Sequence, residues 1–234
     1  MTEFRPGRFE LIPTVIKNLI IVNALVFFAQ NVFQHSTGFN VEQMFALHDF
    51  RSPYFRPHQF ITHMFLHGGF DHIFFNMFAL WMFGSILENL WGPKRFLLFY
   101  VACGLGAALL HMGTLYYELT PAWETFKSLS PSEQEQLLYA DNFLINQSTV
   151  GASGAIFGCL AAFAYLFPNS LIYVYFFLPV KAKWFVLIYG AMELWLGIRN
   201  SAGDNVAHWA HLGGAVVGLI LVWTWNKRNR REFY

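Results

Sequence analysis

Residues 150–168, VGASGAIFGCLAAFAYLFP, form an uncharged, largely apolar stretch with small residues at Gly151, Gly154 and Gly158. About 20 mostly apolar residues cross the hydrocarbon core of a bilayer, and small residues about four apart let membrane helices approach closely. Five further apolar stretches accompany it, at 14–34, 70–90, 95–117, 183–198 and 206–226. The pattern predicts an all-α, polytopic membrane protein whose six transmembrane helices form one bundle.

The composition agrees with a membrane protein. Hydrophobic residues make up 56% of the chain, charged residues 12%, and the mean hydropathy is +0.38. A typical soluble domain is about one quarter charged, so most of this chain is expected to face lipid. The net charge of +1 and the lack of a basic stretch interleaved with aromatic residues argue against a nucleic-acid partner. Cys103 and Cys159 both fall within predicted spans, where we expect buried thiols.

The basic residues predict that both termini are cytoplasmic. Cytoplasmic segments of membrane proteins carry an excess of Lys and Arg. With six spans and both ends inside, eleven of the fifteen basic residues lie on the inner side: Arg5, Arg8, Lys17, Lys94, Arg95, Lys181, Lys183, Lys227, Arg228, Arg230 and Arg231. The four on the outer side are Arg51, Arg56, Lys127 and Arg199. The second, fourth and sixth spans then run from outside to inside.

The segments between the spans complete a single membrane domain over residues 1–234, with a core at about 10–226. Residues 35–69 are rich in Phe and His and are expected to form an outer interfacial loop. Residues 118–149 are expected to form a second outer loop with a short surface helix that starts near Ser130. Residues 171–180 are apolar but too few to span, so we expect them at the interface or against the bundle. Residues 227–234 form a basic cytoplasmic tail.

Polar groups recur within about the first two turns of alternate spans: His72 and Asn76, Ser153, and His211. Because these three spans run the same way, the groups should meet near the outer surface. A serine hydroxyl is a weak nucleophile until a base removes its proton, and neutral histidine is the usual base. His72 and Asn76, four apart on one helical face, are suitable donors for an oxyanion.

Structural roles are open for each of these groups taken alone. Ser153 and the nearby glycines also suit close helix packing, and a histidine in a bundle can donate to a backbone carbonyl. Gly213, Gly214 and Gly218 give the sixth span a smooth face that could press against Gly154 and Gly158. We find no acidic residue placed to orient His211, so the residues favour a Ser-His dyad over a triad.

Taken together, His72-x-x-x-Asn76, Gly151-Ala-Ser-Gly154 and Ala210-His-Leu-Gly-Gly214 resemble the rhomboid family of intramembrane serine proteases, over about residues 10–226. The resemblance implies a rhomboid-like six-helix bundle with Ser153 as nucleophile and His211 as general base. It implies an oxyanion hole from His72, Asn76 and the Ser153 backbone N–H, and no cofactor or metal. Substrates would be transmembrane proteins cut near their outer ends, with 183–198 as a movable gate and 200–206 as a cap with a hinge at Gly203.

Two positions depart from the family's usual pattern. Rhomboids often carry Trp-Arg before the second span, where His58-Gln59 stands here. The aromatic residue that packs on the catalytic histidine is often Tyr, and Phe157 occupies the matching position. We expect ring stacking to survive that change and a phenolic hydrogen bond to be lost. The departures concern loop anchoring and fine positioning rather than the reacting groups.

Two other functions fit parts of the sequence. A metal-dependent membrane protein is suggested by His63 and His67, four apart, and by His208 and His211, three apart. A non-catalytic rhomboid-like protein could bind transmembrane helices without cutting them. The length and the absence of an obvious targeting extension suggest a cell membrane, in particular a bacterial inner membrane. The residues leave the substrate, its cleavage site and the oligomeric state open.

Overall fold

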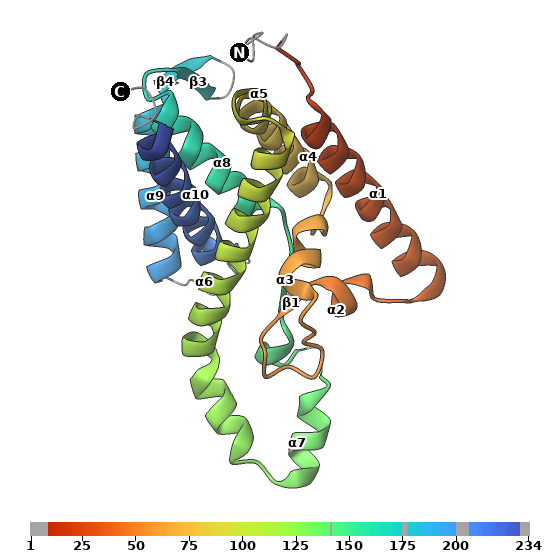
Figure 1. Ribbon diagram of the computed structural model, residues 1–234. Coiled ribbons are helices and arrows are strands. Elements are labelled where there is room, and N and C mark those ends of the chain that lie inside the picture. Colours follow the sequence, from red (N-terminus) through yellow and green to blue (C-terminus); the bar gives the residue numbers. More distant parts are fainter. Residues whose placement is uncertain (1–8, 141, 175–176, 200–205, 230–234) are drawn as a thin grey trace.

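The computed structural model describes residues 9–140, 142–174, 177–199 and 206–229. Within these residues the chain is mostly helical, and a helix covers each of the six predicted spans (Figure 1). These helices are α1 (Thr14–Thr37), α4 (Phe70–Ala79) with η2 (Leu80–Gly84) and α5 (Ser85–Trp91), α6 (Pro93–Lys127), α8 (Ser153–Leu166), α9 (Ala182–Arg199) and α10 (His208–Asn229). The six predicted ranges therefore match helices, with one substantial difference in length.

Three helical segments among the described residues are long and apolar enough to cross a membrane: Thr14–Ser36, Phe70–Trp91 and Pro93–Lys127. The chain is thus a helical, multi-pass membrane protein, and the count of six spans with cytoplasmic termini stays a prediction. Helix α8 is apolar but has only 14 residues. At 1.5 Å per residue it is about 21 Å long, which is shorter than the roughly 30 Å hydrocarbon core.

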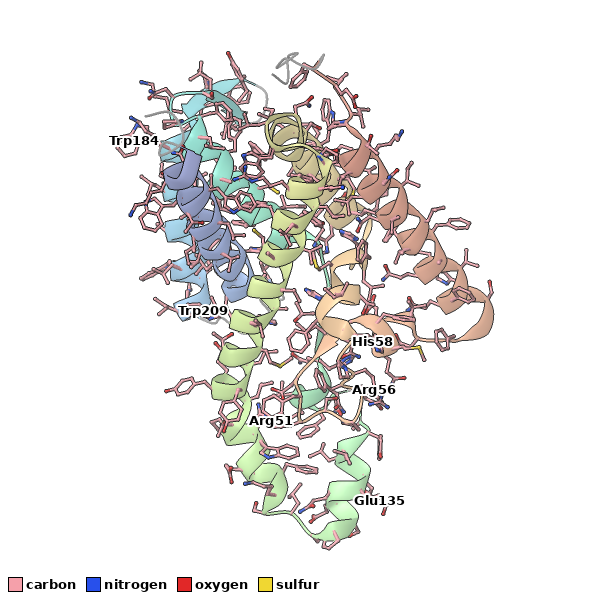
Figure 2. The ribbon with its side chains drawn as sticks, in the orientation of Figure 1. Arg51, Arg56, His58, Glu135, Trp184 and Trp209 are labelled. Atoms are coloured by element: carbon pink, nitrogen blue, oxygen red, sulfur yellow. The ribbon has the colours of Figure 1, made fainter. Side chains whose placement is uncertain are left out.

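The long helices alternate in direction, as Figure 1 shows. Helices α4, α8 and α10 begin at one level of the bundle and run the same way, whereas α1, α6 and α9 run in the opposite direction. The parallel course predicted for the second, fourth and sixth spans is therefore present. Figure 2 shows His58 near the end of the bundle where these three helices begin and Trp184 at the other end.

The segment before α4 contains α2 (Val41–Phe45), β1 (Leu47–His48), α3 (Gln59–Thr62) and η1 (His63–Phe65). The segment before α8 contains α7 (Pro131–Leu138), η3 (Leu144–Asn146) and β2 (Ser148–Thr149). The two segments join where β1 and β2 pair antiparallel, with Leu47 opposite Thr149. The expectation of a purely helical chain therefore needs the addition of short strands.

Two boundaries differ from the prediction. Helix α6 does not end at residue 117 but continues through Pro121 to Lys127, because Phe126 packs on Phe143 and Ile145 below it. The predicted surface helix is present as α7, where Ser130 and Glu133 form a capping box. The expected loop at 118–149 is therefore helical over its first ten residues.

The apolar residues at 171–180 form a β-hairpin. Strands β3 (Leu171–Val174) and β4 (Leu178–Lys181) pair antiparallel, with Leu171 opposite Lys181. The hairpin links α8 to α9 and lies beyond the C-terminal end of α8 (Figure 1). Hydrogen bonding between the strands satisfies backbone groups that a lone apolar stretch would leave exposed.

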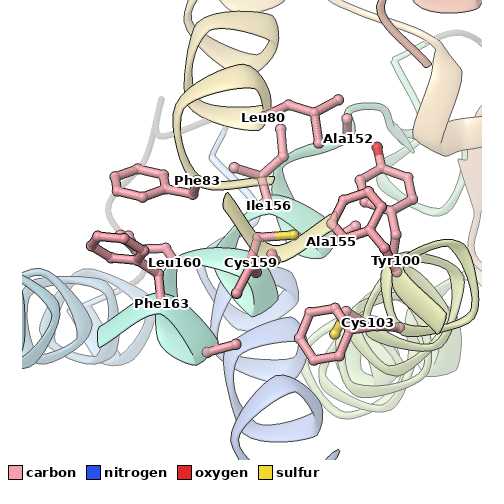
Figure 3. Close-up of a cluster of buried hydrophobic side chains, with 14 of the residues drawn as sticks. Leu80, Phe83, Tyr100, Cys103, Ala152, Ala155, Ile156, Cys159, Leu160 and Phe163 are labelled. Carbon is pink, nitrogen blue, oxygen red and sulfur yellow. The ribbon is translucent and has the colours of Figure 1, made fainter. Parts of the chain in front are cut away.

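The core lies between α6, α8 and the π-helical turn η2 (Figure 3). Tyr100 and Cys103 of α6 face Ile156 and Cys159 of α8, and all four are at most 5% exposed. Both cysteines are buried free thiols, as predicted.

Glycines bring α8 and α10 into backbone contact, as the sequence predicts. A Cβ atom at Gly218 would lie 2.6 Å from the Gly158 carbonyl oxygen, and one at Gly214 would overlap the Gly154 carbonyl. Real Cβ atoms do not approach backbone so closely. Only glycine therefore allows the two helices to lie at this separation.

Candidate active site

The predicted site residues lie at the starts of three parallel helices. His72 is the third residue of α4, Ser153 is the first of α8, and His211 is the fourth of α10. The close α8–α10 contact brings Ser153 and His211 together, since Gly154 and Gly214 each lie within a turn of these residues. The chain thus brings residues that are 58 apart in sequence into one polar cluster.

Ser153 and His211 form a hydrogen bond. The Ser153 Oγ atom lies 2.8 Å from Nε2 of His211. The ring of Phe157, one turn along α8, stacks on the imidazole with centroids 4.2 Å apart and planes 6° from parallel. Stacking therefore survives the change from Tyr to Phe, as expected. The serine is within the reach required of a nucleophile and its base.

The turn into α8 is built around Gly151, whose φ of 132° disfavours other residues. Its N–H donates to the His63 carbonyl at 2.9 Å, and the β1–β2 ladder holds the residues just before it. A Cβ atom here would lie 3.0 Å from the His72 ring and 3.5 Å from Ser153 Oγ. Gly151 thus leaves room for the histidine beside the serine.

His72 and Asn76 occupy the same face of α4. The Gly68 N–H donates to Nδ1 of His72 at 3.3 Å, so the neutral ring carries its proton on Nε2, which is near Gly151. Nδ2 of Asn76 donates to the His72 carbonyl at 2.9 Å and keeps a second N–H. As the first residue of α8, Ser153 has an N–H without an intrahelical acceptor. The His72 ring and the Ser153 N–H thus lie beside the serine turn, and Asn76 lies one turn further along α4.

The His58-Gln59 pair anchors the outer segment, residues 41–69, which precedes α4. Gln59 is fully buried; its amide donates to the carbonyls of Met44 and Tyr54 at 3.2 and 2.9 Å and accepts from the His48 N–H at 3.4 Å. Nε2 of His58 contacts the Met44 carbonyl at 3.0 Å. Glutamine supplies both donors and an acceptor. The departure from Trp-Arg therefore leaves the segment tethered.

A carboxylate contacts the candidate base, contrary to the sequence expectation. Glu193 of α9 is 4% exposed, and its Oε2 atom lies 2.9 Å from Nδ1 of His211 and 2.6 Å from Nδ1 of His208. The expectation that no acidic residue orients His211 was wrong. An ionisable group at membrane depth is itself a functional signal, and Glu193 was the one acidic residue of its apolar stretch.

The histidines weighed as metal ligands divide into two groups. His63 donates from Nδ1 to the Gln59 carbonyl at 2.8 Å, and burial lowers its pKa to about 4. His67 packs edge-on against His72, and burial, then His72, lowers its pKa to about 4. By contrast, ligand atoms of Glu193, His208 and His211 lie within 4.8 Å of one another, a residue set that zinc accepts.

One further polar contact had no signal in the sequence. Nε2 of His111, in the middle of α6, lies 2.7 Å from the Thr149 hydroxyl just before the serine turn. The contact fastens β2 to the central helix. The predicted cap at 200–206, with its hinge at Gly203, lies outside the described residues except for Val206.

Comparison with known proteins identifies the family. A family model described as a rhomboid domain matches residues 54–228. RHOMBOID-like protein 12, mitochondrial, of Arabidopsis thaliana is 31% identical over 220 residues, which cover 94% of this chain and 60% of that protein. Rhomboid protein 1, mitochondrial, of Saccharomyces cerevisiae is 30% identical, covering 72% of this chain and 42% of that protein.

A bacterial relative has protease in its name. Rhomboid protease AarA of Providencia stuartii is 28% identical over 216 residues, which cover 87% of this chain and 69% of that protein. The chain spans less than two thirds of the length of the two mitochondrial relatives. The domain match nevertheless extends over most of the chain and includes every residue of the predicted site. This protein belongs to the rhomboid family of membrane proteins.

Proposed function

We propose that this protein is an intramembrane serine endopeptidase that uses Ser153 as nucleophile and His211 as general base. The observation that carries the proposal is the 2.8 Å contact between Ser153 Oγ and His211 Nε2, joining two helices that glycines hold in backbone contact. The site belongs to a family in which several relatives are named as proteases. A merely structural serine needs no unprotonated imidazole nitrogen beside it.

The short α8 supports a site below the membrane surface. If Leu166 lies at the inner boundary of the hydrocarbon core, a helix of about 21 Å leaves Ser153 about 9 Å short of the outer boundary. Polar groups from α4 and α10 meet it at that depth. The scissile bond is therefore proposed to lie in the outer part of a substrate's transmembrane segment.

The reaction proceeds in two halves. Ser153 Oγ attacks the scissile carbonyl carbon while its proton passes to Nε2 of His211; the tetrahedral intermediate then collapses, and the same proton goes to the leaving amine. A water molecule next gives a proton to His211 and attacks the acyl ester. As the second tetrahedral intermediate collapses, His211 returns the proton to Ser153 Oγ and the acid is released. The negative oxygen formed in each half accepts from His72 Nε2–H, the Asn76 amide and the Ser153 N–H.

The proposed substrates are membrane proteins with a transmembrane segment that can unwind near its outer end. A helical peptide bond is shielded by its own backbone hydrogen bonds, so helix-weakening residues would expose it to the serine.

The lipid bilayer is both the solvent of this protein and its proposed partner. We place the protein in a cell membrane with both termini in the cytoplasm. A bacterial inner membrane is the proposed location, while the named relatives include both mitochondrial and bacterial proteins.

A fluorophosphonate probe tests the proposal because it forms a covalent bond only with an activated serine. We expect labelling of Ser153 in the wild type, no labelling of Ser153→Ala, and a fall in cleavage of a transmembrane substrate by about 10⁶-fold. The control is Ser170→Ala, an exposed serine beyond the other end of α8. Cleavage retained by a folded Ser153→Ala protein would reject the nucleophile.

Labelling and a chelation test together separate the two alternative functions. A rhomboid-like binder would capture a transmembrane helix without labelling in the wild type. A metal-dependent enzyme would lose cleavage after exhaustive chelation and regain it with zinc. The cluster of Glu193, His208 and His211 is the observation that keeps the metal test necessary.

A further inference from the structure

Three buried side chains from two helices meet at the carboxylate of Glu193. It comes from α9 and contacts His208 and His211, which lie one turn apart on α10. Glu193 is 4% exposed and both histidines are at most 8% exposed. A buried carboxylate is costly unless it is hydrogen-bonded, and here two ring nitrogens reach the same oxygen. The three side chains thus form a buried, hydrogen-bonded polar cluster rather than an exposed ion pair.

The hydrogen-bonding partners of His211 define its tautomer. An ionised carboxylate can only accept, so Nδ1 of His211 must carry the proton at the 2.9 Å contact. In the neutral ring, Nε2 then has the lone pair, and this is the nitrogen that lies 2.8 Å from Ser153 Oγ. The opposite tautomer would point a proton at the serine and leave it without a base.

From this geometry we propose that Glu193 is a positioning residue that turns the predicted dyad into a Ser153-His211-Glu193 triad. The inference rests on the proposed protease function. Glu193 holds the Nδ1–H tautomer, fixes the rotation of the imidazole within its plane, and stabilises the imidazolium that forms during attack. Phe157 fixes the plane itself by stacking. His208 donates to the same carboxylate oxygen and so keeps it in position.

The distances favour hydrogen bonds over metal ligation. Tetrahedral zinc with donors at about 2.0–2.1 Å separates those donors by about 3.3 Å. The two nitrogens lie only 2.6 and 2.9 Å from the glutamate oxygen, which are the lengths of charge-assisted hydrogen bonds. His211 also has its other nitrogen on Ser153. Hydrogen bonds therefore hold the three side chains of this cluster together.

The origin of Glu193 on α9 has a mechanical consequence. Ser153 and His211 lie on α8 and α10, whose backbones touch, whereas α9 meets the site through side chains such as Tyr189, which packs on Phe157 at 4.9 Å. A displacement of α9 away from α10 would remove the carboxylate and leave the serine and histidine together. Catalytic competence therefore depends on where α9 lies.

Glu193→Gln tests the inference, because glutamine keeps the size of the side chain and loses its charge. We expect kcat to fall by about 10²–10⁴-fold, as for loss of the orienting carboxylate in other triads, with KM changed less than about threefold. The rate of fluorophosphonate labelling should fall in parallel but remain measurable. Glu193→Asp, which keeps the charge, should have a higher kcat than Glu193→Gln. Glu124→Gln, an exposed glutamate of α6, is the control.

The outcomes distinguish this inference from the proposed function. If the wild type is not labelled at Ser153, the proposed protease function is wrong. If the wild type is labelled and the kcat of Glu193→Gln is within about twofold of the wild-type value, only the triad is wrong. Restoration of chelated wild type by zinc would also overturn the triad. Should Glu193→Gln not fold, nitrogen-15 NMR of the wild type, with His211→Gln to assign the signal, decides. We expect protonated Nδ1 and bare Nε2 on His211; the reverse would refute the inference.

Discussion

Two regions of the bundle are held together in different ways. The α8–α10 pair forms a backbone contact through Gly154, Gly158, Gly214 and Gly218. Helix α1 instead reaches the outer segment through side chains, with an apolar cavity of about 370 Å³ between them. In the most apolar window of each helix, 22% of α1 is buried, against 50% of α6. The candidate reacting pair thus lies where two helices meet through their backbones, whereas α1 meets its neighbours through side chains.

The outer segment, residues 41–69, depends on polar anchors instead. Arg51 binds Asp49 through two nitrogens at 2.8 Å, and its guanidinium lies 5.1 Å from the centre of the Tyr116 ring on α6. Gln59 and His63 add buried hydrogen bonds. Directional contacts of this kind satisfy the polar groups of irregular backbone, and Leu47 adds apolar packing against Ala108 and Met112 of α6. Backbone contact should therefore be the least tolerant of substitution, followed by the anchors and then the cavity.

Gly214→Val should have the largest effect. Its Cβ would overlap the Gly154 carbonyl, so the helices must separate, at a cost of at least about 3 kcal/mol in the free energy of unfolding. Fluorophosphonate labelling should disappear because Ser153 and His211 move apart. Gly113→Val, on α6 where a Cβ meets nothing within 4 Å, is the control. Wild-type stability and labelling in Gly214→Val would refute the importance of this contact.

Acidification should have the second largest effect, because it lowers the stability of the outer segment. The pKa of buried His63 is about 4 in the folded protein against 6.5 for an ordinary histidine, so the unfolded chain binds the proton first. Stability is full above pH 6.5, falls as the pH drops toward 4, and is lower by at most about 3 kcal/mol at the end of that window. Thermal unfolding in detergent between pH 7 and 4 measures the slope. His63→Gln should reduce the slope without abolishing it, because the pKa of His67 is also lowered to about 4; an unchanged slope would contradict the prediction.

Arg51→Lys should have a moderate effect. Lysine keeps the charge but cannot bind Asp49 through two nitrogens or lie flat against the rings of Phe50 and Tyr116. We expect a loss of about 2 kcal/mol in unfolding free energy. The matched control is Arg56→Lys, whose guanidinium contacts only nearby loop carbonyls among the bonds described. Equal losses in the two variants would show that the anchor has no special role.

Ala29→Leu should have the smallest effect, and of opposite sign. Ala29 lines the cavity beside α1, and a larger side chain there can fill empty space. We expect the free energy of unfolding to rise by about 0.5 kcal/mol, with labelling of Ser153 unchanged. Thermal unfolding and labelling on the same preparation measure both. Destabilisation would mean that α1 is packed as tightly as α10.

Much of the fold follows from local chemistry. The helices at 14–37, 153–166 and 208–229 lie close to the predicted apolar ranges, because a chain in lipid must satisfy its backbone internally. The end of α6 could not be found this way, since Phe126 holds the last turns in place by packing on Phe143, a residue beyond the next helix. The hairpin at 171–181 likewise depends on pairing between strands.

The sequence by itself determined the helices, their parallel order at the site, and the choice of Ser153, His211, His72 and Asn76 as candidate groups. It could do so because apolar length and motif spacing are properties of contiguous residues. Only the tertiary structure decided that Glu193 meets His211, because that contact depends on how α9 is rotated about its axis and packed beside α10. Neither the rotation nor the packing of α9 is encoded in the spacing of residues 193 and 211. The sequence therefore indicated two candidate groups, Ser153 and His211, where the folded protein has three side chains in contact.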